Sequence, residues 1–141
     1  MTLPAQRRVD AVEACRARFE GKPYKPGTRD CVKLAGCVMH RMGRRVGLTK
    51  GVRYSTEAGA LKALKKAGFN DLPSAVSAAG LERIAPAAAL PGDLFGFESH
   101  DAFGCSLWVN LGNGKALGFK ADHENGVVIV IEETPKYALR V

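Results

Sequence analysis

The sequence predicts an α+β fold, in which helices in the first half of the chain precede an antiparallel sheet. Three observations indicate this order. Up to Gly80, apolar residues recur at the three- and four-residue spacing of amphipathic helices. After Leu81, apolar runs of strand length are separated by turns that contain Gly or Asn. Helices that are followed by strands with short connections are typical of the α+β class.

The helical half divides into four segments at residues that start or stop helices. Pro4 suits a first turn, and Asp30 suits an N-cap. Ser55 or Thr56 caps the third segment. Glycines are expected to end the helices. The expected bounds are 4–19, 31–45 with stops at Gly47 and Gly51, 55 or 56 to the stop at Gly68, and 72–79.

The second half reads as a series of strands. A short extended piece at 81–84 precedes a Pro-rich connector, and the expected strands are 93–98, 105–112, 115–120, 127–132 and 137–141. Gly112-Asn113-Gly114 carries the residues of a tight hairpin turn, and Asn125-Gly126 is a second such signal. The 141 residues show no repeat or linker, so one domain is expected over 1–141.

Composition narrows the function classes. No apolar run reaches the ~18 to 20 residues of a membrane span, and the N-terminal residues lack the apolar core of a signal peptide. The four cysteines form no C-x-x-C pair, so neither a metal nor a cofactor is expected. Without a secretory signal, free thiols are expected, with Cys15 and Cys37 as small buried apolar residues.

The chain is basic, with a net charge of +7, and its Lys and Arg residues concentrate in the first half. Such a balance suits nucleic acid or an acidic partner. No aromatic side chains interleave with the charges as stacking platforms would, which favours solvated helix faces. Nucleic-acid binding therefore ranks third among the functions considered; it would use Arg41, Arg44, Arg45, Lys62, Lys65 and Lys66.

The candidate site begins at Asp30-Cys31. Asp30 as N-cap places Cys31 at the first helical position, where unpaired backbone N–H groups and the helix dipole favour negative charge. A thiol in that position can become a thiolate nucleophile.

Four motifs in a fixed order then identify a resemblance. They are Gly27-x-x-Asp30-Cys31 with its apolar helix, Tyr54 to Ala60, Pro91-Gly92-Asp93-Leu94-Phe95, and the strand that ends Leu111-Gly112-Asn113-Gly114. Over residues 20–141 the chain resembles NlpC/P60 cell-wall peptidases, and in particular the small NlpC/P60-like proteins of tailed bacteriophages. The resemblance implies a papain-like α+β architecture, with Cys31 at the position of the nucleophile.

The resemblance also places the expected partners of the nucleophile. The histidine base of these enzymes falls on Ser106, or on Cys105 with a slip of one residue, and the orienting group falls near Gly118 or Phe119. Neither Ser106 nor Cys105 can act as an imidazole base, and neither Gly118 nor Phe119 can orient one. A nucleophile without its base loses most of its activation.

Three histidines remain as substitutes. His40 lies roughly 13 Å further along the helix of Cys31 and on its opposite side, which excludes it. His123 lies between acids in a turn and is expected to be solvated. His100, in the turn before the strand of Ser106, is the remaining candidate base. Cys31 is therefore either structural, which is favoured, or catalytic with His100.

We expect a structural or assembly component of a phage tail tip or baseplate with a degenerate NlpC/P60-like fold. The resemblance implies a virion location after synthesis in the host cytoplasm. It also implies hub or other tail proteins as partners, together with peptidoglycan; no membrane partner is expected. The strand at 137–141 is expected to pair with the edge of a neighbour. The alternative is an active cysteine endopeptidase that cuts peptidoglycan during phage entry, with Cys31 and His100 as its catalytic residues.

Overall fold

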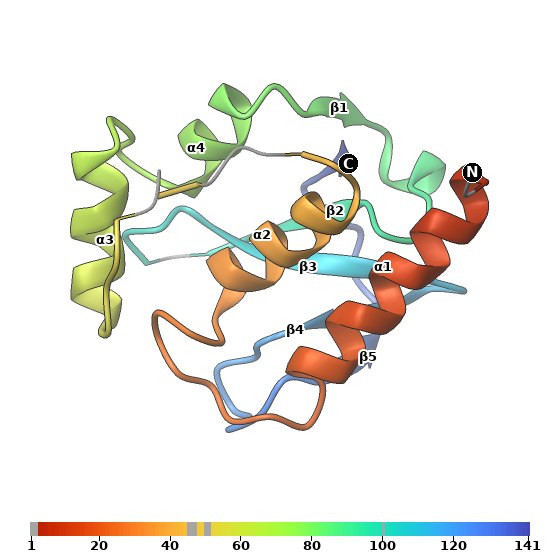
Figure 1. Ribbon diagram of the computed structural model, residues 1–141, viewed down its shortest axis with the longest axis horizontal. Helices are drawn as coiled ribbons and strands as arrows, with labels where there is room; N and C mark the ends of the chain where they lie inside the picture. The colour runs from red at the N-terminus through yellow and green to blue at the C-terminus, as the bar shows by residue number, and fades with distance from the viewer. Residues whose placement is uncertain (1–2, 45–47, 50–51, 100) are drawn as a thin grey trace.

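The computed structural model describes residues 3–44, 48–49, 52–99 and 101–141. Four helices come first: α1 (Pro4–Phe19), α2 (Cys31–Arg41), α3 (Glu57–Lys66) and α4 (Leu72–Ala78). A strand β1 (Glu82–Ile84) and a short 3₁₀ turn η1 (Pro86–Ala88) lead to β2 (Leu94–Glu98), β3 (Cys105–Gly112), β4 (Lys115–Gly118), β5 (Val127–Val130) and β6 (Tyr137–Arg140). The predicted α+β order is confirmed (Figure 1).

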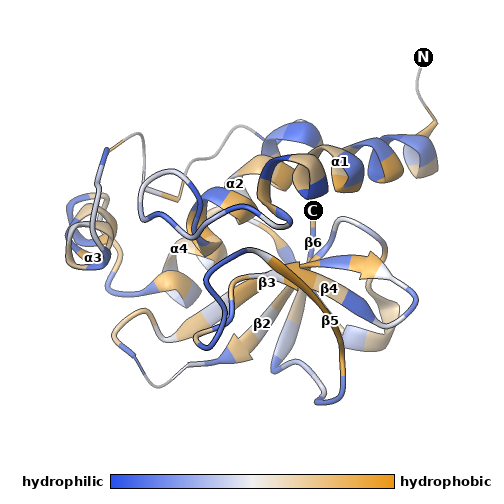
Figure 2. Cartoon of the chain, turned by 90° about the horizontal axis from the view of Figure 1, so that it is seen from below, coloured by the Kyte–Doolittle hydropathy of each residue, from blue (hydrophilic) through white to orange (hydrophobic). Residues whose placement is uncertain are grey.

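The strands form one antiparallel sheet in the order β1-β6-β2-β3-β4-β5. Helices α1 and α2 lie across one face of it (Figure 1, Figure 2). Side chains alternate between the two faces, as strand geometry requires. Leu107 and Val109 of β3 belong to the main core with the helices, whereas Trp108 belongs to a smaller apolar cluster with Phe95 and Ala116.

Side-chain caps define where the helices begin. The carboxylates of Asp30 and Asp71 and the hydroxyl of Thr56 each accept a hydrogen bond from the backbone N–H three residues later, at 2.8–2.9 Å. The prediction of these starts was accurate because capping is a local signal.

The end of α2 differs from the prediction. The helix ends at Arg41 rather than at Arg45, because Gly43 takes a left-handed conformation with φ +83° and the Arg44 N–H returns to the Met39 carbonyl. The predicted end at Arg45 and the stops at Gly47 and Gly51 lie outside the described residues.

The sheet confirms one predicted turn and corrects two other expectations. Gly112, Asn113 and Gly114 all have positive φ in the β3–β4 hairpin. Asn125-Gly126 forms no tight hairpin: both residues bridge to the segment after α1, at Pro23 and Glu20, so long-range pairing replaces the turn. The strand β6 is not an edge, because it pairs with β1 and β2. The edge strands are β1 and β5.

One buried carboxylate joins the two ends of the chain. Asp93, which is 0% exposed, accepts hydrogen bonds from Arg8 of α1 at 3.0 Å and from the backbone N–H of Val141 at 2.9 Å. Its other oxygen accepts the N–H of Leu90 at 2.8 Å, and Arg140 lies 3.5 Å away. Asp93, which directly precedes β2, therefore ties this strand to α1 and to the residue that follows β6.

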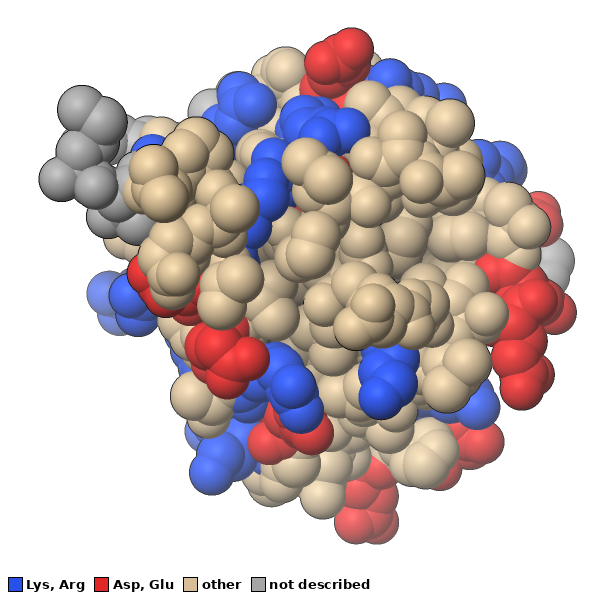
Figure 3. Space-filling view, turned by 90° about the vertical axis from the view of Figure 1, so that its right-hand side faces the viewer, with Lys and Arg blue, Asp and Glu red and all other residues tan. Residues whose placement is uncertain are grey.

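Within the part of the chain that the structure describes, no helix has the length and apolar character needed to cross a membrane. On the face shown in Figure 3, Lys and Arg side chains lie interspersed with Asp and Glu around an uncharged surface.

Candidate functional site

The site is built around the N-terminus of α2, which Asp30 holds in place. Its carboxylate accepts three hydrogen bonds: from the backbone N–H of Lys33 at 2.8 Å, from that of Gly27 at 2.9 Å, and from the Tyr54 hydroxyl at 2.6 Å. Asp30 is buried, so these bonds compensate for its lost hydration. They fix the loop before α2 and the segment before α3 to the same point.

A groove of about 570 Å³ opens beside this helix terminus. It lies between the loop before α2, the β2–β3 connection and the segment that follows β4. Among the described residues, its lining combines aromatic, acidic and thiol side chains with Lys120 and His123. The lining includes Tyr24, Cys31, Glu57, Glu98, Asp101, Phe103, Cys105, Ser106, Trp108, Phe119, Lys120 and His123.

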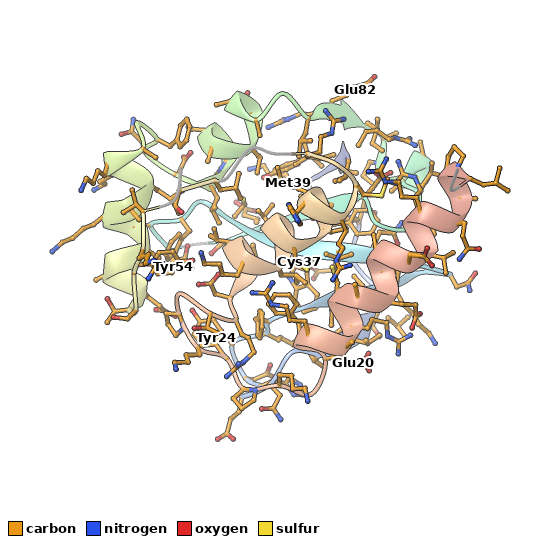
Figure 4. The ribbon with its side chains drawn as sticks, viewed as in Figure 1. Glu20, Tyr24, Cys37, Met39, Tyr54 and Glu82 are labelled. Carbon is orange, nitrogen blue, oxygen red and sulfur yellow. The ribbon has the colours of Figure 1, made fainter. Side chains whose placement is uncertain are left out.

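Aromatic side chains form much of the groove wall. Tyr24 packs edge-on against Phe119 with ring centroids 5.4 Å apart, and its hydroxyl donates to Glu57 at 2.9 Å. Figure 4 shows Tyr24 and Tyr54 at the end of α2 where Cys31 begins the helix. Trp108 lies across Gly118, where a Cβ would collide with the indole ring.

The Cys31 thiol lies at the first position of α2 and faces β3, where the Leu107 backbone N–H donates to it. Burial and, to a lesser extent, the neighbouring Asp30 carboxylate raise the pKa of Cys31 to about 12, against the opposing effect of the Leu107 hydrogen bond. The thiol is therefore protonated at neutral pH. The expected activation by the helix terminus is outweighed.

Ser106 and Cys105, the two positions on which the resemblance places the base, line the same groove as Cys31, and neither side chain is a base. Ser106 lines the groove with Cys31, and its hydroxyl accepts the indole N–H of Trp108 at 3.0 Å. Cys105 is buried and accepts the Tyr137 hydroxyl at 3.0 Å. At the position of the orienting group, Gly118 lies under Trp108 and Phe119 packs against aromatic rings.

Of the two described histidines, His123 lines the groove and His40 does not. His100 lies outside the described residues. His40 is exposed near the far end of α2. His123 is about half exposed, 3.9 Å from Asp122, and lines the groove that contains Cys31. The expectation that His123 is solvated agrees with its exposure, but its place in the groove wall was missed.

Sequence reasoning also missed the acidic side of the groove. Glu57, Glu98 and Asp101 come from three different elements or connections, so no sequence motif links them. Over the described ranges, no group of three or more His, Cys, Asp or Glu side chains is arranged to hold a metal ion.

Comparison with solved structures supports this architecture. RipD from Mycobacterium tuberculosis, described as a non-catalytic NlpC/p60 domain protein adapted to peptidoglycan binding, is similar with a TM-score of 0.50 and 19% identity. The match covers 95% of this chain and 97% of RipD. The fold is thus that of an NlpC/p60-like domain.

The family follows from the sequence itself. A family described as a domain of unknown function, DUF6950, matches residues 5–141, and the chain belongs to it. No protein with a curated function matches the sequence.

Proposed function

We propose that this protein is a non-catalytic NlpC/P60-like component of a bacteriophage tail tip or baseplate that binds peptide material of the cell wall in its groove. One observation carries the proposal: the groove keeps its cysteine, whereas the two residues on which the resemblance places the base cannot act as one, since the Ser106 hydroxyl accepts the Trp108 indole N–H and Cys105 accepts the Tyr137 hydroxyl. The NlpC/P60-like architecture is thus kept without a histidine at either position where the resemblance places the base.

The groove has the chemistry of a peptide-binding site. Tyr24, Trp108 and Phe119 offer apolar and π surfaces, whereas Glu57 and Glu98 offer acceptors for an amino group. The peptidoglycan-binding description of RipD, a protein with the same fold, supports this class of ligand. The location in a phage tail and the tail-protein partners rest on the order of the sequence motifs.

The chain carries its own probe for binding. Trp108 is the single tryptophan and lines the groove, so its fluorescence reports occupancy without labelling. Titration with soluble peptidoglycan fragments is expected to give a saturable change in emission. Glu98→Gln is expected to weaken binding by about tenfold, the effect of losing one charge-assisted hydrogen bond.

The control is Glu82→Gln, which makes the same change at an exposed position on β1, at the opposite end of the view from Tyr24 (Figure 4). Its titration should match that of the wild type. An emission that does not respond to peptidoglycan fragments would refute the ligand class. The tail role has its own test, because it requires a stable complex with a hub or distal tail protein in co-purification.

The second candidate is a peptidoglycan endopeptidase. The observation that favours it is the presence of His123 and Cys31 in the wall of one groove, together with His100 as the base expected from the sequence. Cys31 would attack the amide carbonyl, and backbone N–H groups at the helix start would hold the oxyanion. One outcome distinguishes the two proposals. The endopeptidase proposal predicts that the wild type releases cleaved peptides and that Cys31→Ala does not, whereas the binding proposal predicts no release by either.

A further inference from the structure

A second pair of thiols lies outside the groove, where α1 packs against α2. Cys15 of α1 is 0% exposed and belongs to the core, whereas Cys37 of α2 is partly exposed at the side that faces α1 (Figure 4). The two side chains are hydrogen-bonded to each other, and neither is in a disulfide. One thiol is thus accessible to a reagent and the other is held beside it.

Two arginines surround this pair. Arg18 follows Cys15 by one helical turn and hydrogen-bonds to Cys37, and Arg41 follows Cys37 by one turn of α2. The hydrogen bond from Cys15 and the two guanidinium groups together lower the pKa of Cys37 to about 6, against the opposing effect of desolvation. Burial and the same hydrogen bond raise the pKa of Cys15. Cys37 is therefore the more exposed and more acidic thiol of the pair, and Cys15 is its buried neighbour.

We propose that Cys15 and Cys37 form a peroxide-sensitive dithiol, which closes into a disulfide that clamps α1 to α2. This arrangement matches the general design of thiol redox sites: an accessible thiolate in a cationic environment with a second cysteine beside it.

A hydroperoxide would be the oxidant of the two thiols. The Cys37 thiolate attacks one peroxide oxygen, the O–O bond breaks, and hydroxide (or an alkoxide) leaves with the bonding electrons. The resulting sulfenic acid is attacked by the Cys15 sulfur. The S–O bond then breaks, the Cys15 proton and the departing hydroxide form water, and the S–S bond closes. Two electrons pass from the two thiols to one peroxide.

The disulfide would act on the scaffold rather than on the groove. Neither cysteine lines the groove, and Arg8 on the same α1 holds Asp93 and the main-chain oxygen of Val141. A clamp between α1 and α2 therefore ties the N-terminus of the groove helix to the Asp93 network. Oxidation is expected to raise the melting temperature, and a thiol reductant should reverse the rise.

The test uses the whole chain treated with hydrogen peroxide and then digested without reduction. Peptide mapping by mass spectrometry is expected to find one linked pair, Cys15 with Cys37, lighter by two hydrogen atoms than the separate peptides. Before oxidation, iodoacetamide at neutral pH should label Cys37 at least about tenfold faster than Cys31, because only the thiolate reacts.

Arg18→Gln and Arg16→Gln provide the matched comparison, since both remove one positive charge from an exposed position on α1. Arg18→Gln should slow the labelling of Cys37, whereas Arg16→Gln, which breaks only a surface pair with Glu20, should not. The proposal is overturned if peroxide yields no Cys15–Cys37 peptide, if Cys37 labels no faster than Cys31, or if both arginine variants label like the wild type.

Discussion

Cys31 and Cys37 lie on the same helix, yet the pKa of Cys31 is raised and the pKa of Cys37 is lowered. Cys31 occupies the helix N-terminus, where the dipole favours a thiolate, yet burial and the Asp30 carboxylate raise its pKa. Cys37 lies further along α2, and its pKa falls because a thiol and two guanidinium groups surround it. At the residue scale, local partners outweigh position in the helix.

The raised pKa of Cys31 predicts a pH dependence of stability. Below pH 9.0 the thiol is protonated in both the folded and the unfolded chain, so the folded state keeps its full stability. Between pH 9.0 and about 12 the unfolded chain releases this proton and the folded chain does not, so stability falls as pH rises. The expected contribution to this slope is about 1.4 kcal/mol per pH unit.

Urea unfolding of the wild type and of Cys31→Ala across this alkaline range measures the effect. The variant should lose stability less steeply, since the other titrating groups are common to both proteins. Parallel curves would mean that the thiol ionises as freely in the folded chain as in the unfolded one.

At the scale of elements, the Asp93 network joins parts of the chain that have no local reason to meet. Asp93→Asn leaves the Arg8 guanidinium, a partly buried cation, without its charged partner. Removal of one member of a buried pair costs about 3–5 kcal/mol. Chemical denaturation should show this loss, whereas Arg16→Gln, in the exposed pair with Glu20, should leave the unfolding midpoint unchanged. Equal midpoints for all three proteins would contradict a structural role for Asp93.

The loop that enters α2 depends on Gly27. Its φ is +86°, and a Cβ at this position would collide with the Tyr54 carbonyl oxygen. Gly27→Ala should destabilise the protein by about 1–3 kcal/mol and shift Trp108 emission as the groove wall moves. The control is Gly21→Ala, because Gly21 has a similar φ of +70° and no atom within 4 Å of the added Cβ. Gly21→Ala carries the backbone strain alone, so an equal loss in the two variants would show that the Tyr54 contact is unimportant.

How far the sequence predicts these elements depends on the range of the interactions. Caps at Asp30 and Thr56 and the hairpin at Asn113 act within a few residues, and these elements lie where the pattern indicated. The place of β6 inside the sheet and the bridges from residues 125–126 to 20–23 depend on long-range pairing, which periodicity does not encode. The same limit applies to the site. The position of the missing base could be found by counting along a motif, whereas His123 reaches the groove through a loop whose Glu124 carbonyl accepts the Tyr24 backbone N–H.

At the scale of the whole molecule, the charge of the groove opposes that of the chain. The net charge of the chain is +7. Among the described side chains that line the groove, however, Glu57, Glu98 and Asp101 are acidic, and Lys120 is the one lysine. A ligand with a free amino group would meet complementary charge inside the groove, although the chain as a whole is basic. This contrast is consistent with the proposed role of the groove as a binding site for peptides that carry an amino group.

The central claim is that this NlpC/P60-like domain binds without cleaving. Its most direct test is to incubate purified peptidoglycan with the wild type, Cys31→Ala and His123→Ala, and to quantify released peptides by mass spectrometry. We predict the same background release from all three proteins, together with sedimentation of each with the peptidoglycan. Release by the wild type that is abolished in Cys31→Ala would contradict the claim and establish a cysteine endopeptidase, and loss in His123→Ala as well would identify the base.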